Sequence, residues 1–135
     1  MELQLLEYVS MNLPKGFDPY SIYLIIVNDI EVGRLTLREG SDEQRYYDGH
    51  IGYSIYPEYR GHHYAYQACL LLKDMLDVDH LIITCDPSNI ASIKTIKKLG
   101  CEYIETRTIP THLKKLFTHD EKVKQIYKWK IGGKL

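Results

Sequence analysis

The stretch "HIGYSIYPEYRGHHYAYQAC", residues 50 to 69, decides the fold, because it changes from one regular structure to another. Residues 50–56 alternate well enough to form a strand, and Pro57 closes that strand. After Gly61, small and apolar side chains recur at spacings of three and four, which is typical of one face of a helix. Arg60 and Gly61 therefore lie in a turn that leads from a strand into a helix.

Such a turn suits an anion. The first turn of a helix leaves backbone N–H groups unpaired and carries the positive end of the helix dipole, and a pyrophosphate is a natural occupant. An Arg-Gly turn before a helix also occurs as plain topology. The turn alone therefore leaves both interpretations open.

The rest of the chain predicts an α+β fold. Residues 3–9 form a strand or a short helix, residues 21–28 and 31–39 form a hairpin, and 40–49 form a polar turn region. The helix that begins after Gly61 runs to about Leu76. It is followed by a buried strand at 80–86, a helix at 90–99, and two strands at 101–109 and 123–131.

Length and charge limit the class of protein. With 135 residues, 44% of them hydrophobic, we expect one domain that spans 1–135. The formal net charge of -1 argues against a dedicated nucleic-acid binder. Residues 107–135 carry eight Lys and Arg against two acids. This basic segment is either a solvated surface or a contact for an anionic partner.

The sequence predicts a cytoplasmic protein. Its first residues lack the apolar core of a secretory signal, and no stretch is apolar enough to span a membrane. The three cysteines form no C-x-x-C pair, which suits a reducing compartment. We therefore expect no membrane association, and a homodimer stays open.

Two motifs resemble the GCN5-related N-acetyltransferase (GNAT) superfamily, and the chain looks like a single-domain bacterial-type member. The family's motif (Gln/Arg)-x-x-Gly-x-(Gly/Ala) follows a strand that ends in a Pro-containing turn, as in "IYPEYRGHHYA" with Arg60 and Ala65. The family's second motif, Asn-x-x-Ser/Ala before a helix that ends in Lys-Leu-Gly, resembles "NIASIKTIKKLG", residues 89 to 100. The resemblance implies a layered α/β/α arrangement, in which helices flank a mixed, mostly antiparallel sheet that splays between its fourth and fifth strands.

The resemblance also implies that acetyl-CoA is the co-substrate. Its pantetheine arm would pair with residues 53–56, and its pyrophosphate would lie on the N–H groups of residues 61–66. Asn89 would cap the second helix and face the pantetheine arm. The implied cofactor-binding residues are Ser54, Ile55, Tyr56, Arg60, Gly61, His62, His63, Tyr64, Ala65, Tyr66, Asn89 and Ser92.

Four positions depart from the family pattern. His63 replaces the central glycine of the first motif, which is tolerable if its φ angle stays negative. Cys101 replaces the family's closing Phe. Ile96 replaces the tyrosine that protonates the leaving thiolate in many members, and Thr84 stands where some members carry a glutamate base.

Direct transfer to an amine needs a base and benefits from an acid. His50 is the nearest candidate base, because an unperturbed imidazole titrates near neutral pH. Tyr53 and Tyr103 are candidate acids, and a backbone N–H near Ile55 would polarise the thioester carbonyl. The acceptor is a small-molecule or peptide amine that the sequence does not identify.

The sequence also suggests three other interpretations. His62 and His63 suggest a metal, but adjacent residues at a helix start diverge by about 100° and rarely share an ion, so we expect no metal. The missing acid leaves open a catalytically impaired acyl-CoA-binding module with a regulatory role. The basic segment leaves open a nucleic-acid-associated protein.

Overall fold

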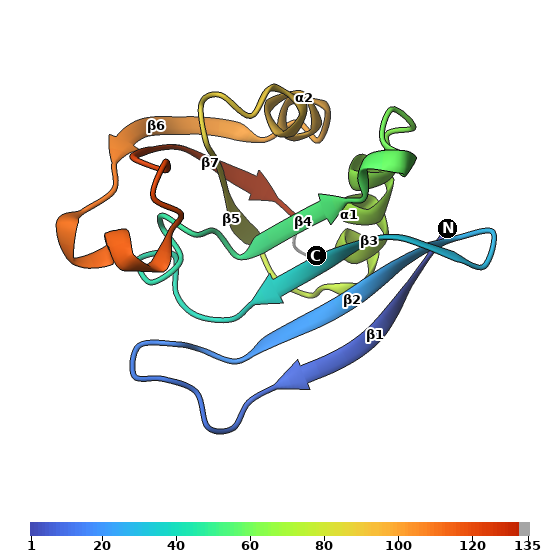
Figure 1. Ribbon diagram of the computed structural model, residues 1–135, viewed down its shortest axis with the longest axis horizontal. Coiled ribbons are helices and arrows are strands. Elements are labelled where there is room, and N and C mark those ends of the chain that lie inside the picture. The colour runs from blue at the N-terminus through green and yellow to red at the C-terminus, as the bar shows by residue number, and fades with distance from the viewer. Residues whose placement is uncertain (133–135) are drawn as a thin grey trace.

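The computed structural model describes residues 1–132 and confirms the predicted α+β fold. Two antiparallel sheets and two helices follow the predicted order (Figure 1). The strands are β1 (Glu2–Val9), β2 (Tyr20–Val27), β3 (Ile30–Arg38), β4 (Ile51–Ile55), β5 (His80–Cys85), β6 (Glu102–Thr108) and β7 (Val123–Lys130). The helices are α1 (Tyr64–Met75) and α2 (Ile90–Lys98), and two 3₁₀ turns are η1 (Pro57–Tyr59) and η2 (Thr111–Leu116).

The strands lie in the orders β1-β2-β3-β4 and β5-β7-β6. All pairs are antiparallel, and the segment that could have been a short helix is strand β1, paired with β2. Figure 1 shows β1 at the outer edge of its sheet and β4 ending beside α1. The two sheets therefore meet at β4 and β5, which is where the resemblance to the family implies the splay.

One core joins the sheets and the helices. It contains the fully buried side chains of Leu35 from β3, Leu72 from α1, Ile96 from α2 and Trp129 from β7. The alternating strand residues and the i, i+3, i+4 helix residues supply these side chains, as their periodicities predict. Ile96 is therefore a core residue. At the helix position where many family members carry a tyrosine, this chain has an apolar side chain that packs in the core.

His50 connects the two sheets where they meet. Its backbone N–H donates to Ile82 O at 2.8 Å, and the Ile82 N–H donates to His50 Nδ1 at 2.9 Å. The imidazole Nε2 lies 2.9 Å from Gly40 O, and the side chain is buried. Because Nδ1 accepts a hydrogen bond, the neutral ring carries its proton on Nε2 and donates it to Gly40.

We expect His50→Ala to destabilise the protein by about 2–4 kcal/mol, because it leaves the Ile82 N–H buried without a partner and removes the hydrogen bond to Gly40 O. Urea unfolding of the purified variant measures this change. His112→Ala, at an exposed position, is the matched control. A loss below about 0.5 kcal/mol, as at an ordinary surface site, would show that the His50 contacts do not hold the sheets together.

The loop 40–49 is fastened to β5 by His80. Its Nε2 lies 2.5 Å from Asp42 Oδ2, and its Nδ1 lies 2.9 Å from Asp79 Oδ2. Hydrogen bonds to Asp42 and then to Asp79 raise the pKa of His80, against burial and the nearby Lys128, which lower it. The charged imidazole is thus favoured in the folded state.

Stability should therefore fall as pH rises through the raised pKa of His80. The contribution of these bonds is fully present below the unfolded pKa, near 6.5, and is lost once the folded imidazole deprotonates. His80→Gln should flatten that part of the stability profile. Melting temperatures of both proteins between pH 6 and pH 9 measure it, and parallel profiles would contradict the prediction.

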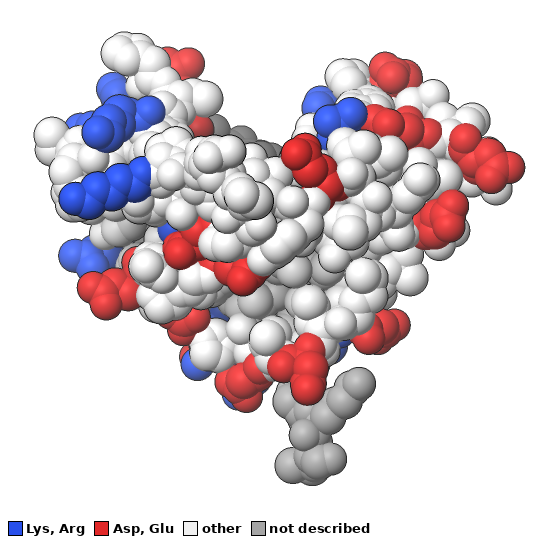
Figure 2. All heavy atoms as spheres, turned by 90° about the horizontal axis from the view of Figure 1, so that it is seen from below, with Lys and Arg blue, Asp and Glu red and all other residues white. Residues whose placement is uncertain are grey.

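Charges are unevenly spread over the surface. Figure 2 looks onto the side of β1 and shows a broad uncharged area, with Lys and Arg gathered at the left and Asp and Glu at the right and lower edges. Within residues 1–132, no helix is long and apolar enough to cross a membrane.

Candidate functional site

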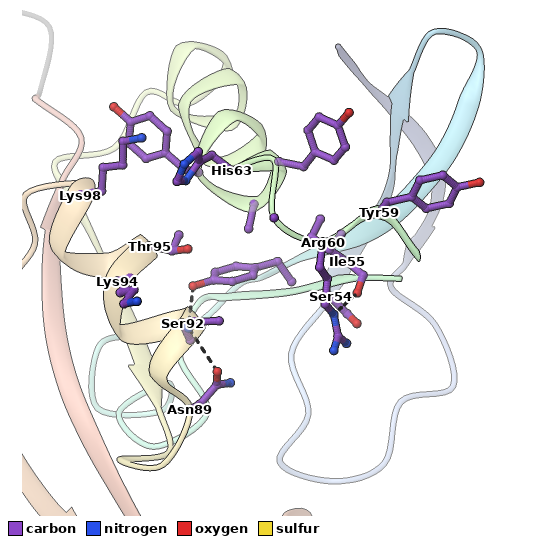
Figure 3. Close-up of a pocket in the computed structure, with 16 residues that line it drawn as sticks. Ser54, Ile55, Tyr59, Arg60, His63, Asn89, Ser92, Lys94, Thr95 and Lys98 are labelled. Atoms are coloured by element: carbon purple, nitrogen blue, oxygen red, sulfur yellow. Dashed lines mark hydrogen bonds between the residues drawn. The ribbon is translucent and has the colours of Figure 1, made fainter. Parts of the chain in front are cut away.

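The splay between β4 and β5 opens into a pocket of about 580 Å³. Its walls come from β4, from the turn before α1, from the start of α1 and from α2 (Figure 3). The structure brings together eleven of the residues that the sequence singled out. These are Tyr53, Ser54, Ile55, Arg60, Gly61, His63, Tyr64, Ala65, Tyr66, Asn89 and Ser92.

The start of α1 presents free backbone donors to this pocket. His63 occupies the N-cap position, but its side chain makes no capping hydrogen bond. The first N–H of this helix with a backbone acceptor among the described residues is that of Gln67, which donates to His63 O at 3.1 Å. The N–H groups of Tyr64, Ala65 and Tyr66 therefore remain available for a ligand.

The expectation that His63 keeps a negative φ was wrong. Its φ is +60°, in the left-handed region, and Gly61 has a φ of +92°. The chain keeps the backbone conformation that the family glycine favours, although for a histidine this left-handed conformation costs about 1–2 kcal/mol of conformational energy. The turn therefore stays shaped around the free N–H groups at the cost of local strain.

The pocket is positively charged. Arg60, Lys94 and Lys98 line it, no Asp or Glu does, and Lys98 Nζ lies 4.6 Å from the centre of the Tyr66 ring. Together with the dipole of α1, these cations favour a polyanionic ligand. The lining therefore fits the pyrophosphate of a coenzyme A derivative.

Sequence reasoning missed five lining residues. They are Tyr59, Ala91, Lys94, Thr95 and Lys98. Four of them lie on α2 at spacings of three and four, so they form one face of the helix. This periodic polar stripe beside the apolar one was the signal that could have found them.

Tyr53 crosses the pocket from β4 to α2. Its hydroxyl lies 2.8 Å from Ser92 Oγ, and the Ser92 N–H donates to the Asn89 side chain at 3.1 Å (Figure 3). Asn89 is therefore the N-cap of α2, as its place in the sequence predicted. Burial raises the pKa of Tyr53 well above its ordinary value, so the hydroxyl keeps its proton at neutral pH.

The edge of β4 carries further backbone groups that face the splay. Tyr56 N donates to Val32 O of β3, so the alternating residues Tyr53 and Ile55 direct their backbone groups away from β3. The Ile55 carbonyl accepts a hydrogen bond from Arg60 Nε at 3.0 Å. The Ile55 N–H remains on the splayed edge, where an extended ligand could pair with it.

Other predicted residues lie outside the pocket lining. The Tyr56 hydroxyl donates to Glu31, His62 stacks on Tyr64 with ring centres 5.1 Å apart, and the Tyr103 hydroxyl lies 2.6 Å from Thr106 Oγ1 on β6. These contacts hold the side chains of Tyr56, His62 and Tyr103 outside the pocket lining.

His50 also lies outside the pocket lining, as a buried residue between the sheets. Both ring nitrogens are engaged, so no lone pair is free for an incoming ammonium group. Thr84, at the family's base position, donates to Tyr47 O at 2.9 Å. In residues 1–132, no three His, Cys, Asp or Glu side chains lie close enough together to hold a metal ion.

A splayed sheet with an uncapped helix start at its opening defines a protein class that binds phosphate-bearing ligands in the splay. The model of the acetyltransferase (GNAT) domain matches residues 4–102, and the chain belongs to this family. A comparison with curated protein sequences finds no match.

Solved structures share the fold at low sequence identity. RimL, a ribosomal L7/L12 alpha-N-protein acetyltransferase in complex with coenzyme A, has a TM-score of 0.67 at 16% identity, over 85% of this chain and 64% of its own. The microcin C7 self-immunity acetyltransferase MccE, in complex with acetyl-CoA and AMP, has a TM-score of 0.63 at 15% identity, and the match covers 81% of this chain and 59% of MccE. An N-acetyltransferase from Staphylococcus aureus Mu50 has a TM-score of 0.59 at 21% identity, and the match covers 83% of this chain and 68% of that protein. The chain thus spans about two thirds or less of these structures.

Proposed function

We propose that the protein is an acetyl-CoA-dependent N-acetyltransferase that transfers the acetyl group directly to a primary amine in a ternary complex. The observation that carries the proposal is the uncapped start of α1 at a pocket that Lys94 and Lys98 line and no carboxylate does. Family membership supports the same ligand. Acetyl-CoA, when bound, supplies an activated acyl group and a thiol leaving group.

Each wall of the pocket has a role in this proposal. The N–H groups of Gly61 and of the first turn of α1 hold the pyrophosphate, and Lys94 and Lys98 add positive charge. The free edge of β4 pairs with the pantetheine arm, and the Ile55 N–H stabilises negative charge that develops on the carbonyl oxygen. Asn89 and Ser92 fix the start of α2 against that arm.

Tyr53 is the proposed proton donor to the leaving thiolate. It lines the pocket, it is protonated at neutral pH, and its ring reaches the helix on which the family tyrosine is missing. No base is assigned to His50, since its nitrogens are engaged. The acceptor amine therefore loses its proton to water or arrives deprotonated.

The acceptor stays a proposal at the level of a primary amine on a peptide or small molecule. RimL is described as acting on the ribosomal protein L7/L12, and MccE as an immunity acetyltransferase, so acceptors differ among structures of this fold. Calorimetry with acetyl-CoA tests the cofactor. Release of free thiol with a panel of peptide, polyamine and small-molecule amines then tests transfer.

An acyl-CoA-binding module with impaired catalysis is the second candidate. The buried Ile96 and the engaged Thr84 favour it, because neither can act as an acid or a base. Binding of acetyl-CoA with no thiol release above the uncatalysed rate, for any amine in the panel, would support the module. Absence of acetyl-CoA binding would contradict both candidates.

A further inference from the structure

The face of β4 that is turned away from the core carries small side chains. In the register of β3 and β4, Gly52 lies opposite Thr36 and Ser54 lies opposite Arg34, whereas their neighbours Leu35 and Tyr53 face the core. The small side chains of Thr36 and Ser54 and the absence of one at Gly52 leave room above this part of the sheet, which we call the strip. It runs along the same strand that borders the pocket, on its other side.

Arg38 lies over one end of this strip. Its Nη1 donates to the carbonyls of Asp48 at 3.3 Å and Gly49 at 3.2 Å, and a Cβ at Gly52 would lie only 3.0 Å from its Nη2. Burial lowers the pKa of Arg38. The Asp48 carboxylate is engaged by Arg45 at 3.0 Å, and within residues 1–132 Arg38 forms no ion pair.

Arg60 lies at the other end. Figure 3 shows its guanidinium turned away from His63 and the start of α1 and lying near Ser54. Its Nε donates a hydrogen bond to Ile55 O. In the described part of the chain, its terminal N–H groups have neither a hydrogen bond nor an ion pair. Arg34, on the same face, is instead paired with Glu31 at 3.5 Å.

Two guanidinium groups that form no ion-pair contact within residues 1–132 therefore flank this strip of small side chains beside the splay, although the Asp48 carboxylate lies near enough to Arg38 to act on it electrostatically. A guanidinium presents paired N–H donors that match a carboxylate, and a partly buried cation without a partner gains from acquiring one. Gly52 and the end of β4 are two to three residues apart, which is about 7–10 Å in a strand. In an extended peptide, side chains two residues apart point to one side at a spacing of about 7 Å.

We propose that this strip binds the acceptor, and that the acceptor is a peptide amine with acidic side chains two residues apart. Arg38 and Arg60 each take one carboxylate, and the N-terminal amine reaches through the splay. This inference rests on the proposed acetyltransfer. Asp and Glu lie at the right and lower edges of the face in Figure 2, so attraction of an acidic peptide has to come from these local cations rather than from the general surface charge.

Matched peptides test the proposal. Ala-Asp-Ala-Asp amide and Ala-Asn-Ala-Asn amide are close in size and differ in charge, and the α-amine is the only aliphatic amine in each. Ala-Lys-Ala-Lys amide reverses the charge, but its side chains are longer and add two amines. We expect kcat/KM for the Asp peptide to exceed that for the Asn peptide by at least about tenfold, as for charge-assisted hydrogen bonds. The excess should shrink toward unity in Arg60→Gln and fall in Arg60→Lys, which keeps the charge and loses the fork.

Arg34→Gln is the matched control, because it removes a guanidinium that Glu31 already pairs. It should leave the peptide preference unchanged. Arg38→Gln should reduce the preference as Arg60→Gln does, and circular dichroism checks that it folds. If Arg38→Gln does not fold, the peptide preference of Arg60→Gln alone decides the test.

Calorimetry with acetyl-CoA separates this inference from the proposed function. Normal acetyl-CoA binding with equal kcat/KM for the Asp and Asn peptides would overturn the acceptor inference and leave the cofactor site intact. A weaker affinity for acetyl-CoA in Arg60→Gln, with the peptide preference unchanged, would overturn it as well and place Arg60 at the pyrophosphate. If none of the peptides is acetylated, equilibrium binding of the same three peptides to the acetyl-CoA-loaded protein decides, and equal or absent binding overturns it.

Discussion

Gly61→Glu is expected to weaken acetyl-CoA binding by about 100-fold or more. The substitution places a carboxylate in the turn where the proposed pyrophosphate lies on the N–H groups of α1. Repulsion between unit charges about 5 Å apart costs about 3 kcal/mol at an effective dielectric constant near 20, which corresponds to this loss. Calorimetry with acetyl-CoA on the folded variant measures it.

Gly61→Ala is the matched control. Gly61 has a φ of +92°, so any side chain strains the turn, but a Cβ there meets no atom within 4 Å. The alanine variant therefore carries the strain without the charge, and we expect it to lose much less affinity. Equal losses in both variants would show that the backbone conformation matters and the negative charge does not, and normal binding by Gly61→Glu would move the pyrophosphate elsewhere.

The arrangement of strands and helices could be predicted because local periodicity and packing agree. The alternation before Pro57 and the three-and-four spacing after Gly61 each match the face that the structure buries, so β4 and α1 lie where the sequence placed them. The same agreement holds for β5 and α2, whose apolar residues enter the common core.

The sequence was least informative where a side chain's environment comes from a distant segment. His50 was a candidate base because its pKa is ordinarily near neutral, yet Gly40 and Ile82 occupy its nitrogens. Lys94 and Lys98 were not predicted as site residues, yet α2 lies across the splay from β4 and both side chains line the pocket. Such contacts depend on how the two sheets meet. The polar stripe of α2 can be found in the sequence, but the sequence does not say which element that stripe faces.

His63 shows a third kind of difference. A histidine in place of the family glycine suggested a negative φ, because side chains disfavour the left-handed region. The surrounding turn imposes +60° instead, so the backbone path is kept and the residue accommodates it. A position that binds ligand through its backbone can therefore change its side chain while its geometry stays the same.

Tyr53→Phe is expected to lower kcat by about 100-fold and to leave the affinity for acetyl-CoA within about threefold, if Tyr53 protonates the leaving thiolate. The hydroxyl lies 2.8 Å from Ser92 Oγ at the α2 side of the pocket. Burial raises its pKa, which keeps it protonated at neutral pH but also makes it a weak acid, so its contribution depends on its position beside the thiolate. The phenylalanine keeps the ring that packs against the core, so folding should be little affected. Thiol release at saturating acceptor measures kcat, and calorimetry measures the affinity.

Tyr59→Phe is the matched control for this loss, because Tyr59 lines the same pocket and its hydroxyl has no hydrogen bond in residues 1–132. It should keep near-normal kcat. A thiol of pKa near 8.5 is a tolerable leaving group, so an enzyme without any acid would still turn over, and the rate would rise with pH until the acceptor amine is deprotonated. If Tyr53→Phe and Tyr59→Phe give the same kcat and the same pH profile, the thiolate leaves without help from Tyr53. The pocket would then act by holding the thioester and a free amine together, and the hydroxyl of Tyr53 would serve only to tie β4 to α2.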